Sequence, residues 1–195
     1  TCTYKRSEII RIARKGFELA MKRSKKLCCV DKANVLESSR LWRETVQAME
    51  KEYPEVEVSY EFVDAVAMRL VQWPNSYDVL ITENLFGDIL TDEASVISGS
   101  MGLMPSASIG TKTSLFEPIH GSYPQAEGKD IANPLATILS AAMMFEDAFG
   151  LKEEAECIRE VVNRSLSEGF VTEDLSNGKK SYKTSEVGDW LASNI

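Results

Sequence analysis

NLFGDILTDEASVIS, residues 84–98, is the stretch on which the interpretation of this chain rests. Helical spacing places Asp88 and Asp92, which are four residues apart, on the same side of one helix. The same spacing gives that helix an apolar face covering about half of its circumference, made of Leu85, Phe86, Ile89, Leu90, Ala94, Val96 and Ile97. The stretch therefore predicts a helix with a wide packing face beside a face that carries two acids.

The two carboxylates of this helix have two explanations. Like charges one turn apart repel by a few tenths of a kcal/mol unless a positive charge lies between them, and a divalent cation would supply that charge. Oxygen-only ligands favour Mg²⁺ or Mn²⁺ over Zn²⁺. The alternative is a solvated acidic face on an amphipathic helix. The helix by itself favours this simpler explanation, because short matches of this kind arise often by chance.

Length and composition place the chain among ordinary globular proteins. Its 195 residues suit one large domain or two small ones. A net charge of −8 without a Lys/Arg cluster argues against nucleic-acid binding, and the longest apolar run, around residues 135–145, is too short to span a bilayer. The four cysteines lack metal-ligand spacing. They indicate thiols in a reducing compartment, so we expect a cytoplasmic protein.

Strand-like and helix-like segments alternate along the first half of the chain. The apolar runs 27–30, 56–62 and 77–82 predict strands, and the amphipathic segments 7–23, 38–49, 64–71 and 84–98 predict helices. This alternation predicts an α/β fold with a largely parallel sheet.

Residues 99–110 are rich in Gly, Ser and Pro, and we place a domain boundary there. The first domain then spans residues 1–98 and the second spans residues 99–195. In the second domain we expect a short strand at 115–119, a loop at 121–129, and helices at 134–149 and 152–168. A last helix places Val187, Trp190 and Leu191 inward.

Several residues are predicted to begin or end these helices. Gly150 is expected to terminate the helix before it. The expected N-terminal caps are Ser7, Ser38 or Ser39, Asn133 followed by Pro134 at the first helical position, and Thr184 or Ser185.

Two charged residues directly follow predicted strands. Ligands of open α/β sheets bind beyond the carboxyl ends of the strands, so Lys32 and Asp64 are candidates for proton transfer and for cation binding. Each has a simpler interpretation: Lys32 as a surface residue paired with Asp31, and Asp64 as a helix cap stabilised by the helix dipole. Position alone favours the simpler interpretations.

His120 is the single histidine of the chain, which excludes a His-rich metal site. It lies in the segment EPIHGS, residues 117–122, a loop able to fold around a flat heteroaromatic ring. The chain contains neither G-x-G-x-x-G nor G-x-x-x-x-G-K-[ST]. A dinucleotide would therefore bind without a Rossmann fingerprint.

Six segments, in this order, resemble one family: VDKANVLE (30–37), VDAVAM (63–68), NLFGDILTDEAS (84–95), PSASIG (105–110), FEPIHGS (116–122) and GKDIANP (128–134). They resemble the 3-isopropylmalate dehydrogenases, a group of β-decarboxylating dehydrogenases related to isocitrate and tartrate dehydrogenases. The resemblance runs along the whole chain. It implies an α/β fold with a parallel or mixed sheet flanked by helices.

The resemblance implies roles for individual residues. Lys32 would be the catalytic lysine that deprotonates the substrate hydroxyl, directly or through water. Asp64, Asp88 and Asp92 would hold Mg²⁺ or Mn²⁺ together with the hydroxyl and carboxylate of the substrate. Val35 would contact the isopropyl group of 3-isopropylmalate.

The resemblance also implies an NAD site. Residues 121–133 would form the adenosine-binding loop, with His120 beside the adenine, Asn133 on its far side and Asn34 near the nicotinamide. NAD-dependent relatives commonly carry Asp where this chain has Gln125, whereas NADP-dependent relatives carry Lys and Tyr in this region, so we expect NAD. The other expected contacts are Glu117, Gly121, Ser122, Tyr123 and Ala132.

In this family the active site spans two subunits of a homodimer. Lys32 and Asp64 of one chain would face Asp88 and Asp92 of the other, and the wide apolar face of residues 84–98 suits a helix that packs across such an interface. The chemistry agrees with these residues. Oxidation of a 2-hydroxy acid gives a 2-keto acid, loss of CO₂ leaves an enolate, and a divalent cation stabilises it.

Family members are nearly twice as long as this chain, which is expected to correspond to their C-terminal part. The N-terminal part would supply the arginines that clamp the substrate carboxylates and a tyrosine general acid, so we expect little activity from the chain alone. The leading hypothesis is an NAD-dependent 3-isopropylmalate dehydrogenase of leucine biosynthesis. The alternatives are a related tartrate- or isocitrate-type enzyme, and a non-catalytic dimerisation module.

Overall fold

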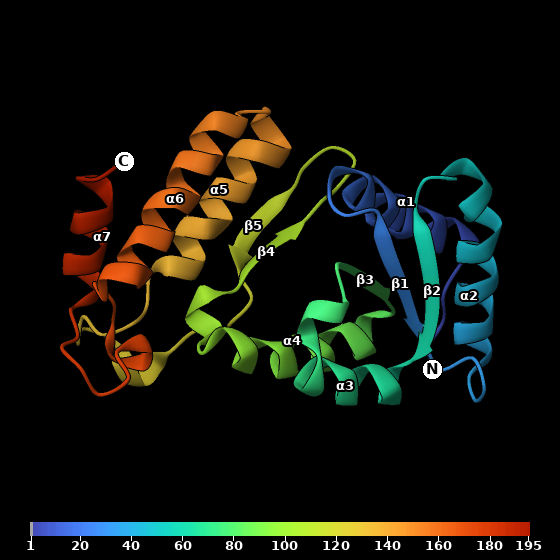
Figure 1. The fold of residues 1–195 in the computed structure, drawn as a ribbon, viewed down its shortest axis with the longest axis horizontal. Helices are drawn as coiled ribbons and strands as arrows, with labels where there is room; N and C mark the ends of the chain where they lie inside the picture. Colours follow the sequence, from blue (N-terminus) through green and yellow to red (C-terminus); the bar gives the residue numbers. More distant parts are fainter. Residues whose placement is uncertain (1) are drawn as a thin grey trace. The chain divides into compact units, whose positions relative to one another are not determined.

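A three-stranded parallel sheet organises the first half of the chain. The computed structural model describes residues 2–195 and divides the chain into two compact units, Thr1–Ile97 and Ser98–Ile195. In the first unit, β1 (Lys26–Asp31) lies between β2 (Glu57–Phe62) and β3 (Val79–Thr82), and both pairings are parallel. Figure 1 shows the strands of this unit and the helices that follow them. The parallel sheet predicted from the alternating pattern is confirmed.

The central strand β1 is buried on both faces. Leu27 and Cys29 pack in one cluster with residues of α1 (Arg6–Lys22) and α2 (Glu37–Met49), including Phe17 and Val46. Cys28 and Val30 point to the other face, where they pack against α3 (Val63–Gln72) and α4 (Asn84–Ser98). Because successive strand residues point to opposite faces, a sheet covered by helices on both sides produces a continuous apolar strand.

The buried cysteines of β1 are part of this packing. Burial raises the pKa of the Cys28 thiol to about 11 and also raises the pKa of Cys29. A thiol with a raised pKa stays protonated near neutral pH and reacts slowly. The predicted free thiols at these two positions are confirmed.

Two predicted helix caps of this unit are wrong. Helix α1 begins at Arg6, and the Glu8 carboxylate accepts a hydrogen bond from the Lys5 backbone N–H at 2.8 Å, so Ser7 lies inside the helix. Helix α2 begins at Glu37, and the hydroxyls of Ser38 and Ser39 donate instead to a carboxylate from another part of the chain, described below. A serine near a helix start is a weak signal, because its hydroxyl serves tertiary contacts equally well.

The second unit packs helices against a short antiparallel hairpin. Strands β4 (Pro105–Ser108) and β5 (Leu115–Pro118) pair with each other and contact α5 (Leu135–Phe149). Helix α5 in turn packs on α6 (Lys152–Glu168), and α7 (Thr184–Ala192) contacts α6. The core of this unit includes Leu135, Val162, Val187 and Leu191. Strand β4 lies in the Gly/Ser/Pro-rich stretch, where no strand was predicted.

The helix ends of the second unit follow the predictions only in part. Gly150 ends α5 in the left-handed conformation, with φ 71°, as predicted. Asn133 accepts a hydrogen bond from the Leu135 backbone N–H at 3.0 Å, although the helix begins at Leu135 rather than at Pro134. Neither Thr184 nor Ser185 caps α7. Both lie within the helix, and the distant Asp130 carboxylate accepts from the Ser185 backbone N–H at 2.9 Å.

Within residues 2–195, no helix combines the length and the apolar character that crossing a membrane requires.

Asp78, directly before β3, ties the start of this strand to the α1–β1 connection. Its carboxylate accepts from the Ser24 backbone N–H at 2.9 Å and hydroxyl at 2.6 Å, and from Arg23 Nε at 2.6 Å. These hydrogen bonds, Ser24 first and Arg23 second, hold the pKa of Asp78 below its ordinary value. The carboxylate therefore stabilises the fold above the unfolded-state pKa of about 3.9, and the stabilisation disappears as the pH falls through the lower folded-state pKa.

We expect Asp78→Asn to lower the free energy of unfolding by about 1 kcal/mol at pH 7, because the charged acceptor is lost. The difference from the unsubstituted protein should shrink below pH 4, measured by urea unfolding at a series of pH values. Glu52→Gln, which removes an exposed carboxylate of the same unit, is the control and should have little effect. A loss for Asp78→Asn that does not change with pH would contradict this role for the charge.

Candidate functional site

The structure brings Lys32 and Asp64 together at the carboxyl edge of the parallel sheet. Asp31 at the end of β1 lies opposite Phe62 at the end of β2, so the residues that follow both strands emerge at the same edge. Lys32 Nζ donates a hydrogen bond to Asp64 Oδ1, and it lies 5.6 Å from the centroid of the Phe62 ring. Lys32 is therefore paired with Asp64, and the interpretation that pairs it with Asp31 is wrong.

Asp64 occupies the first turn of α3, where its side chain is 65% exposed. The hydrogen bond from Lys32 is the main cause that holds the pKa of Asp64 below its ordinary value. The carboxylate is therefore ionised near neutral pH and open to solvent. Such a group is able to bind a cation in addition to the lysine, since an ionised carboxylate has two acceptor oxygens.

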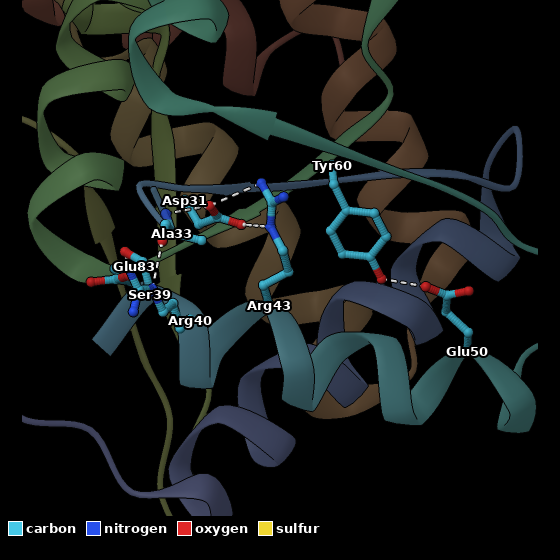
Figure 2. Close-up of polar contacts among 8 residues, drawn as sticks. All are labelled: Asp31, Ala33, Ser39, Arg40, Arg43, Glu50, Tyr60 and Glu83. Carbon is cyan, nitrogen blue, oxygen red and sulfur yellow. Dashed lines mark hydrogen bonds and ion pairs between the residues drawn. The ribbon is translucent and has the colours of Figure 1, made fainter. Parts of the chain in front are cut away.

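Asp31, the residue before Lys32, is fully buried and forms an ion pair with Arg43 of α2 (Figure 2). Arg43 Nε lies 2.7 Å from Oδ2 and Nη2 lies 3.0 Å from Oδ1, so the guanidinium binds both carboxylate oxygens. Oδ1 also accepts from the Ala33 backbone N–H at 2.9 Å. These bonds fix the backbone on both sides of Lys32. A bidentate pair of this kind restricts orientation more strongly than a single hydrogen bond.

The guanidinium of Arg43 also contacts two aromatic rings of β2. Its central carbon lies 5.5 Å from the ring centroid of Tyr60 and 5.1 Å from that of Phe62. The Tyr60 hydroxyl donates to Glu50 at the end of α2, as Figure 2 shows. Burial, followed by the hydrogen bond to Glu50, raises the pKa of Tyr60, so its hydroxyl keeps its proton. Phe62 is therefore in contact with both the structural Arg43 and the candidate catalytic Lys32.

The turn after Lys32 exposes the next two predicted site residues. The Lys32 carbonyl accepts from the backbone N–H of Val35 at 2.9 Å, which closes the turn before α2. Asn34 is exposed, and Val35 is 64% exposed. An exposed valine in the turn that follows Lys32 offers a small apolar contact next to a polar site.

Glu83 is a buried carboxylate that was not predicted from the sequence. It follows β3 and is 3% exposed. Its oxygens accept a hydrogen bond from the Ser39 hydroxyl (Figure 2) and, at 3.5 Å, one from the Ser38 hydroxyl. These are the two serines that were expected to cap α2. Glu83 therefore joins the start of α2 to the residue before α4. The available signal was its position directly after a buried strand, the same signal that identified Lys32.

Asp88 and Asp92 lie on α4, and both are exposed. Helix α4 spans the residues predicted for it, which confirms that the two acids are one helical turn apart. Within residues 2–195, no three His, Cys, Asp or Glu side chains gather closely enough to hold a metal ion. A single chain thus places Lys32 and Asp64 together and leaves Asp88 and Asp92 on an exposed helix.

The second unit contains a cavity of about 570 Å³. Six of the predicted cofactor residues line it: His120, Gly121, Ser122, Tyr123, Ala132 and Asn133. Glu117 and Gln125, also predicted, do not line this cavity, and Asn34 belongs to the first unit. The cavity is therefore formed largely by the loop in which the adenosine site was expected.

Other residues of this cavity were not predicted. Ser100 and Gly102 come from the beginning of the unit, and Glu173 and Asp174 come from a 3₁₀ turn, η5 (Glu173–Leu175), near its end. The Asp174 carboxylate accepts hydrogen bonds from Ser100, Asn133 and Thr172. No sequence motif marks these residues, because only the fold brings the three segments together.

Comparison with known proteins gives a consistent result. Residues 1–191 match the profile of the isocitrate/isopropylmalate dehydrogenase family. The 3-isopropylmalate dehydrogenase of Bacteroides fragilis is 57% identical over 196 residues, covering 100% of this chain and 55% of the relative. That of Sulfurimonas denitrificans is 53% identical over 194 residues, covering 98% of this chain and 55% of the relative.

Solved structures agree with these matches. Isocitrate dehydrogenase from Methylococcus capsulatus superposes with a TM-score of 0.94 at 38% identity, covering 100% of this chain and 57% of that one. A β-decarboxylating dehydrogenase from Thermococcus kodakarensis gives a TM-score of 0.88 at 38% identity, covering 98% and 56% of the two chains. The chain spans about 55% of the length of the curated relatives named above.

The Asp31–Arg43 pair should be far more important for stability than the neighbouring exposed pair of the same helix. We expect Arg43→Met to lower the free energy of unfolding by about 3 kcal/mol, because it leaves a buried carboxylate without its counter-charge. Arg40→Met is the matched control. Arg40 pairs with Glu37, whose side chain is 82% exposed, and its Nε donates to the Ala33 carbonyl at 2.9 Å. Both contacts are exposed, so the loss of Arg40 should cost about 1 kcal/mol. Equal losses in urea unfolding would contradict a structural role for the buried pair.

Proposed function

Because the chain belongs to the isocitrate/isopropylmalate dehydrogenase family, we propose that it supplies part of an enzyme that oxidises and decarboxylates 3-isopropylmalate with NAD. The observation that carries this proposal is the Lys32–Asp64 pair at the carboxyl edge of the sheet, held by the buried Asp31–Arg43 pair. The chain spans about 55% of the curated relatives, so the complete reaction is proposed for a protein of their full length. It would be a cytoplasmic step of leucine biosynthesis.

In the proposed reaction the side chain of Lys32 accepts the proton of the substrate hydroxyl, directly or through one water. NAD, when bound, would supply the hydride acceptor for the hydrogen on the same carbon. The resulting 2-keto acid carries a carboxylate on the next carbon. Loss of this carboxylate as CO₂ leaves an enolate. The tyrosine general acid expected from the N-terminal part of the full-length protein would donate the proton to its carbon that completes 4-methyl-2-oxopentanoate. Lys32 is positioned for this work by Asp64 on one side and by the fixed backbone of Asp31 on the other.

Asp64, Asp88 and Asp92 are the proposed ligands of a divalent cation. All three are exposed carboxylates, and within residues 2–195 no salt bridge involves Asp88 or Asp92. An all-oxygen donor set suits Mg²⁺ or Mn²⁺ and excludes a preference for thiolate-binding metals. The ion, when bound, acts as a Lewis acid that stabilises negative charge on the substrate oxygen.

The cavity of the second unit is the proposed site of the adenosine half of NAD. Its lining by His120 and Asn133 supports this assignment. Gln125 does not line this cavity and offers no charge to repel the 2′-phosphate of NADP, whereas Glu173 and Asp174 do line the cavity. Two carboxylates there disfavour a further phosphate, since like charges at short range repel. This charge supports NAD rather than NADP.

We further propose that two copies of the chain associate through α4. Leu85, Ile89 and Val96 are 62%, 56% and 78% exposed, and their spacings of four and seven residues place them on one stripe of the helix. Asp92 lies three residues after Ile89 and four before Val96, and therefore on the same side. A partner that covers the apolar stripe necessarily approaches the acids of α4, which is the arrangement that a shared active site requires.

The catalytic role of Lys32 is testable in a chimera that joins the preceding N-terminal part of the Bacteroides fragilis relative to this chain. We expect the chimera to oxidise 3-isopropylmalate with NAD and Mn²⁺, measured by NADH absorbance and CO₂ release. Lys32→Met should lower kcat by about 10²- to 10⁴-fold, the usual contribution of a general acid–base group. Lys26→Met, an exposed lysine at the other end of β1, is the control.

Two results would contradict the assignment. A Lys32→Met chimera with unchanged kcat would remove the lysine from the mechanism. A chimera that turns over isocitrate or tartrate faster than 3-isopropylmalate would instead assign a different substrate.

Association through α4 is testable on the chain itself. We expect the unsubstituted chain to sediment as a dimer, and Ile89→Glu to shift it to the monomer, because a charge would be buried in the apolar interface. Leu19→Glu is the matched control, since Leu19 is 47% exposed on α1 and lies outside the proposed interface. A dimer that survives Ile89→Glu would place the interface elsewhere.

A further inference from the structure

Asp174 connects three segments of the cavity in the second unit. Its Oδ2 accepts from Asn133 Nδ2 at 2.9 Å and from the Ser100 hydroxyl, and its Oδ1 accepts from the Thr172 hydroxyl at 2.5 Å. Thr172 is 1% exposed, so one of these bonds anchors the carboxylate to the core. The other two bonds reach residues that line the cavity.

The hydrogen bonds of Asn133 leave its side chain little freedom. Its Oδ1 accepts from the Leu135 backbone N–H at 3.0 Å, and its Nδ2 donates to Asp174. An amide group carries two N–H donors and one carbonyl acceptor, so one donor remains for a ligand. The start of α5 holds the side-chain oxygen of Asn133, and Asp174 holds one of its side-chain N–H groups. These two bonds fix the plane of the Asn133 amide before any ligand is present.

The opposite side of Asn133 is equally restricted. A Cβ atom at Gly102 would lie 2.6 Å from Asn133 Cβ, so the backbone of this turn packs directly against the asparagine. The Gly102 backbone N–H donates to the Ser100 hydroxyl at 3.0 Å, and that hydroxyl donates to Asp174. The carboxylate thus also holds the turn that packs on Asn133.

We propose that Asp174 is a positioning residue for the adenosine pocket, which orients the Asn133 amide and the Ser100–Gly102 turn before the nucleotide binds. This inference rests on the proposed function, because it takes the cavity to be the adenosine site. In this role Asp174 acts through Asn133 and the Ser100–Gly102 turn and does not itself contact the nucleotide. Its carboxylate already accepts three hydrogen bonds from side chains of the protein, and its charge disfavours contact with the phosphates of the ligand.

Removing the Asp174 carboxylate should leave the Asn133 amide less ordered before the nucleotide binds. Asp174→Asn keeps the shape of the side chain but cannot accept all three hydrogen bonds, because half of its amide group is a donor. The Asn133 amide then has to be ordered by the ligand, and ordering a side chain on binding lowers affinity. We expect AMP to bind the chain about tenfold more weakly after Asp174→Asn, measured by chemical-shift titration.

The matched control is Glu173→Gln. Glu173 lines the same cavity beside Asp174 and carries the same charge, but no side-chain hydrogen bond of Glu173 to residues 2–195 links it to Asn133 or Ser100. Glu173→Gln removes one charge from the cavity without removing a hydrogen bond to Asn133 or Ser100, so its change in AMP affinity measures the effect of charge. We expect Asp174→Asn to weaken AMP binding more than Glu173→Gln does, and an equal loss in the two variants would overturn the inference.

A double-mutant cycle separates positioning from a general structural effect. If Asp174 acts through Asn133, Asp174→Asn should weaken AMP binding less than about threefold in an Asn133→Ala background. The side-chain amide resonance of Asn133 should also shift in Asp174→Asn without nucleotide. An unchanged resonance, or the full tenfold loss in the Asn133→Ala background, would overturn the inference.

AMP binding by the unsubstituted chain separates the assignment of the cavity as the adenosine site from the inference about Asp174. If the unsubstituted chain does not bind AMP, the assignment of the cavity as the adenosine site fails, and the role of Asp174 in nucleotide binding fails with it. If AMP binds but the variants do not differ as described, only the inference about Asp174 fails.

Discussion

The buried carboxylate of Asp31 is the constraint around which the candidate active site is arranged. A fully buried charge requires a partner, and Arg43 of α2 provides it with two hydrogen bonds. This requirement fixes α2 against the end of β1. It also places the Arg43 guanidinium on Phe62, the residue that ends β2 and is contacted by Lys32. The buried Asp31–Arg43 pair therefore supports the exposed Lys32–Asp64 pair. Supporting contacts of this kind are what a preorganised site requires.

The second unit uses a carboxylate in a related way. Asp174 gathers hydroxyl and amide donors from three segments, as Asp31 gathers a guanidinium and a backbone N–H. The difference lies in burial: Asp31 is inaccessible and balanced by a full positive charge, whereas Asp174 is exposed and held by neutral donors. Neutral hydrogen bonds suffice where water still solvates the charge.

Helix α4 carries a wider apolar face than its contact with the core requires. Only Leu90 and Ser95 of α4 are buried, and Leu90 supplies its contact with the core cluster of α3 and β1. The exposed side carries Leu85 and Val96 beside the two acids. An exposed apolar stripe next to functional groups is typical of a binding surface. The proposed dimer interface and the proposed metal ligands therefore lie on the same helix.

The sequence alone determined the helices and most of the strands, the parallel sheet, and the α4 helix with its paired acids. It also indicated the family, which the comparisons confirm. It did so because alternation, helical spacing and long ordered motifs are local properties. It did not indicate strand β4. The tertiary structure decided which partner each polar group takes. Ser38 and Ser39 donate to Glu83 rather than capping α2, and the Asp130 carboxylate rather than Thr184 or Ser185 accepts from the start of α7. Asp174, which no motif marks, joins the cavity formed by the predicted adenosine loop. A hydroxyl or carboxylate bonds whichever donor or acceptor the fold brings within about 3 Å, and that distance is set by packing between segments far apart in the chain.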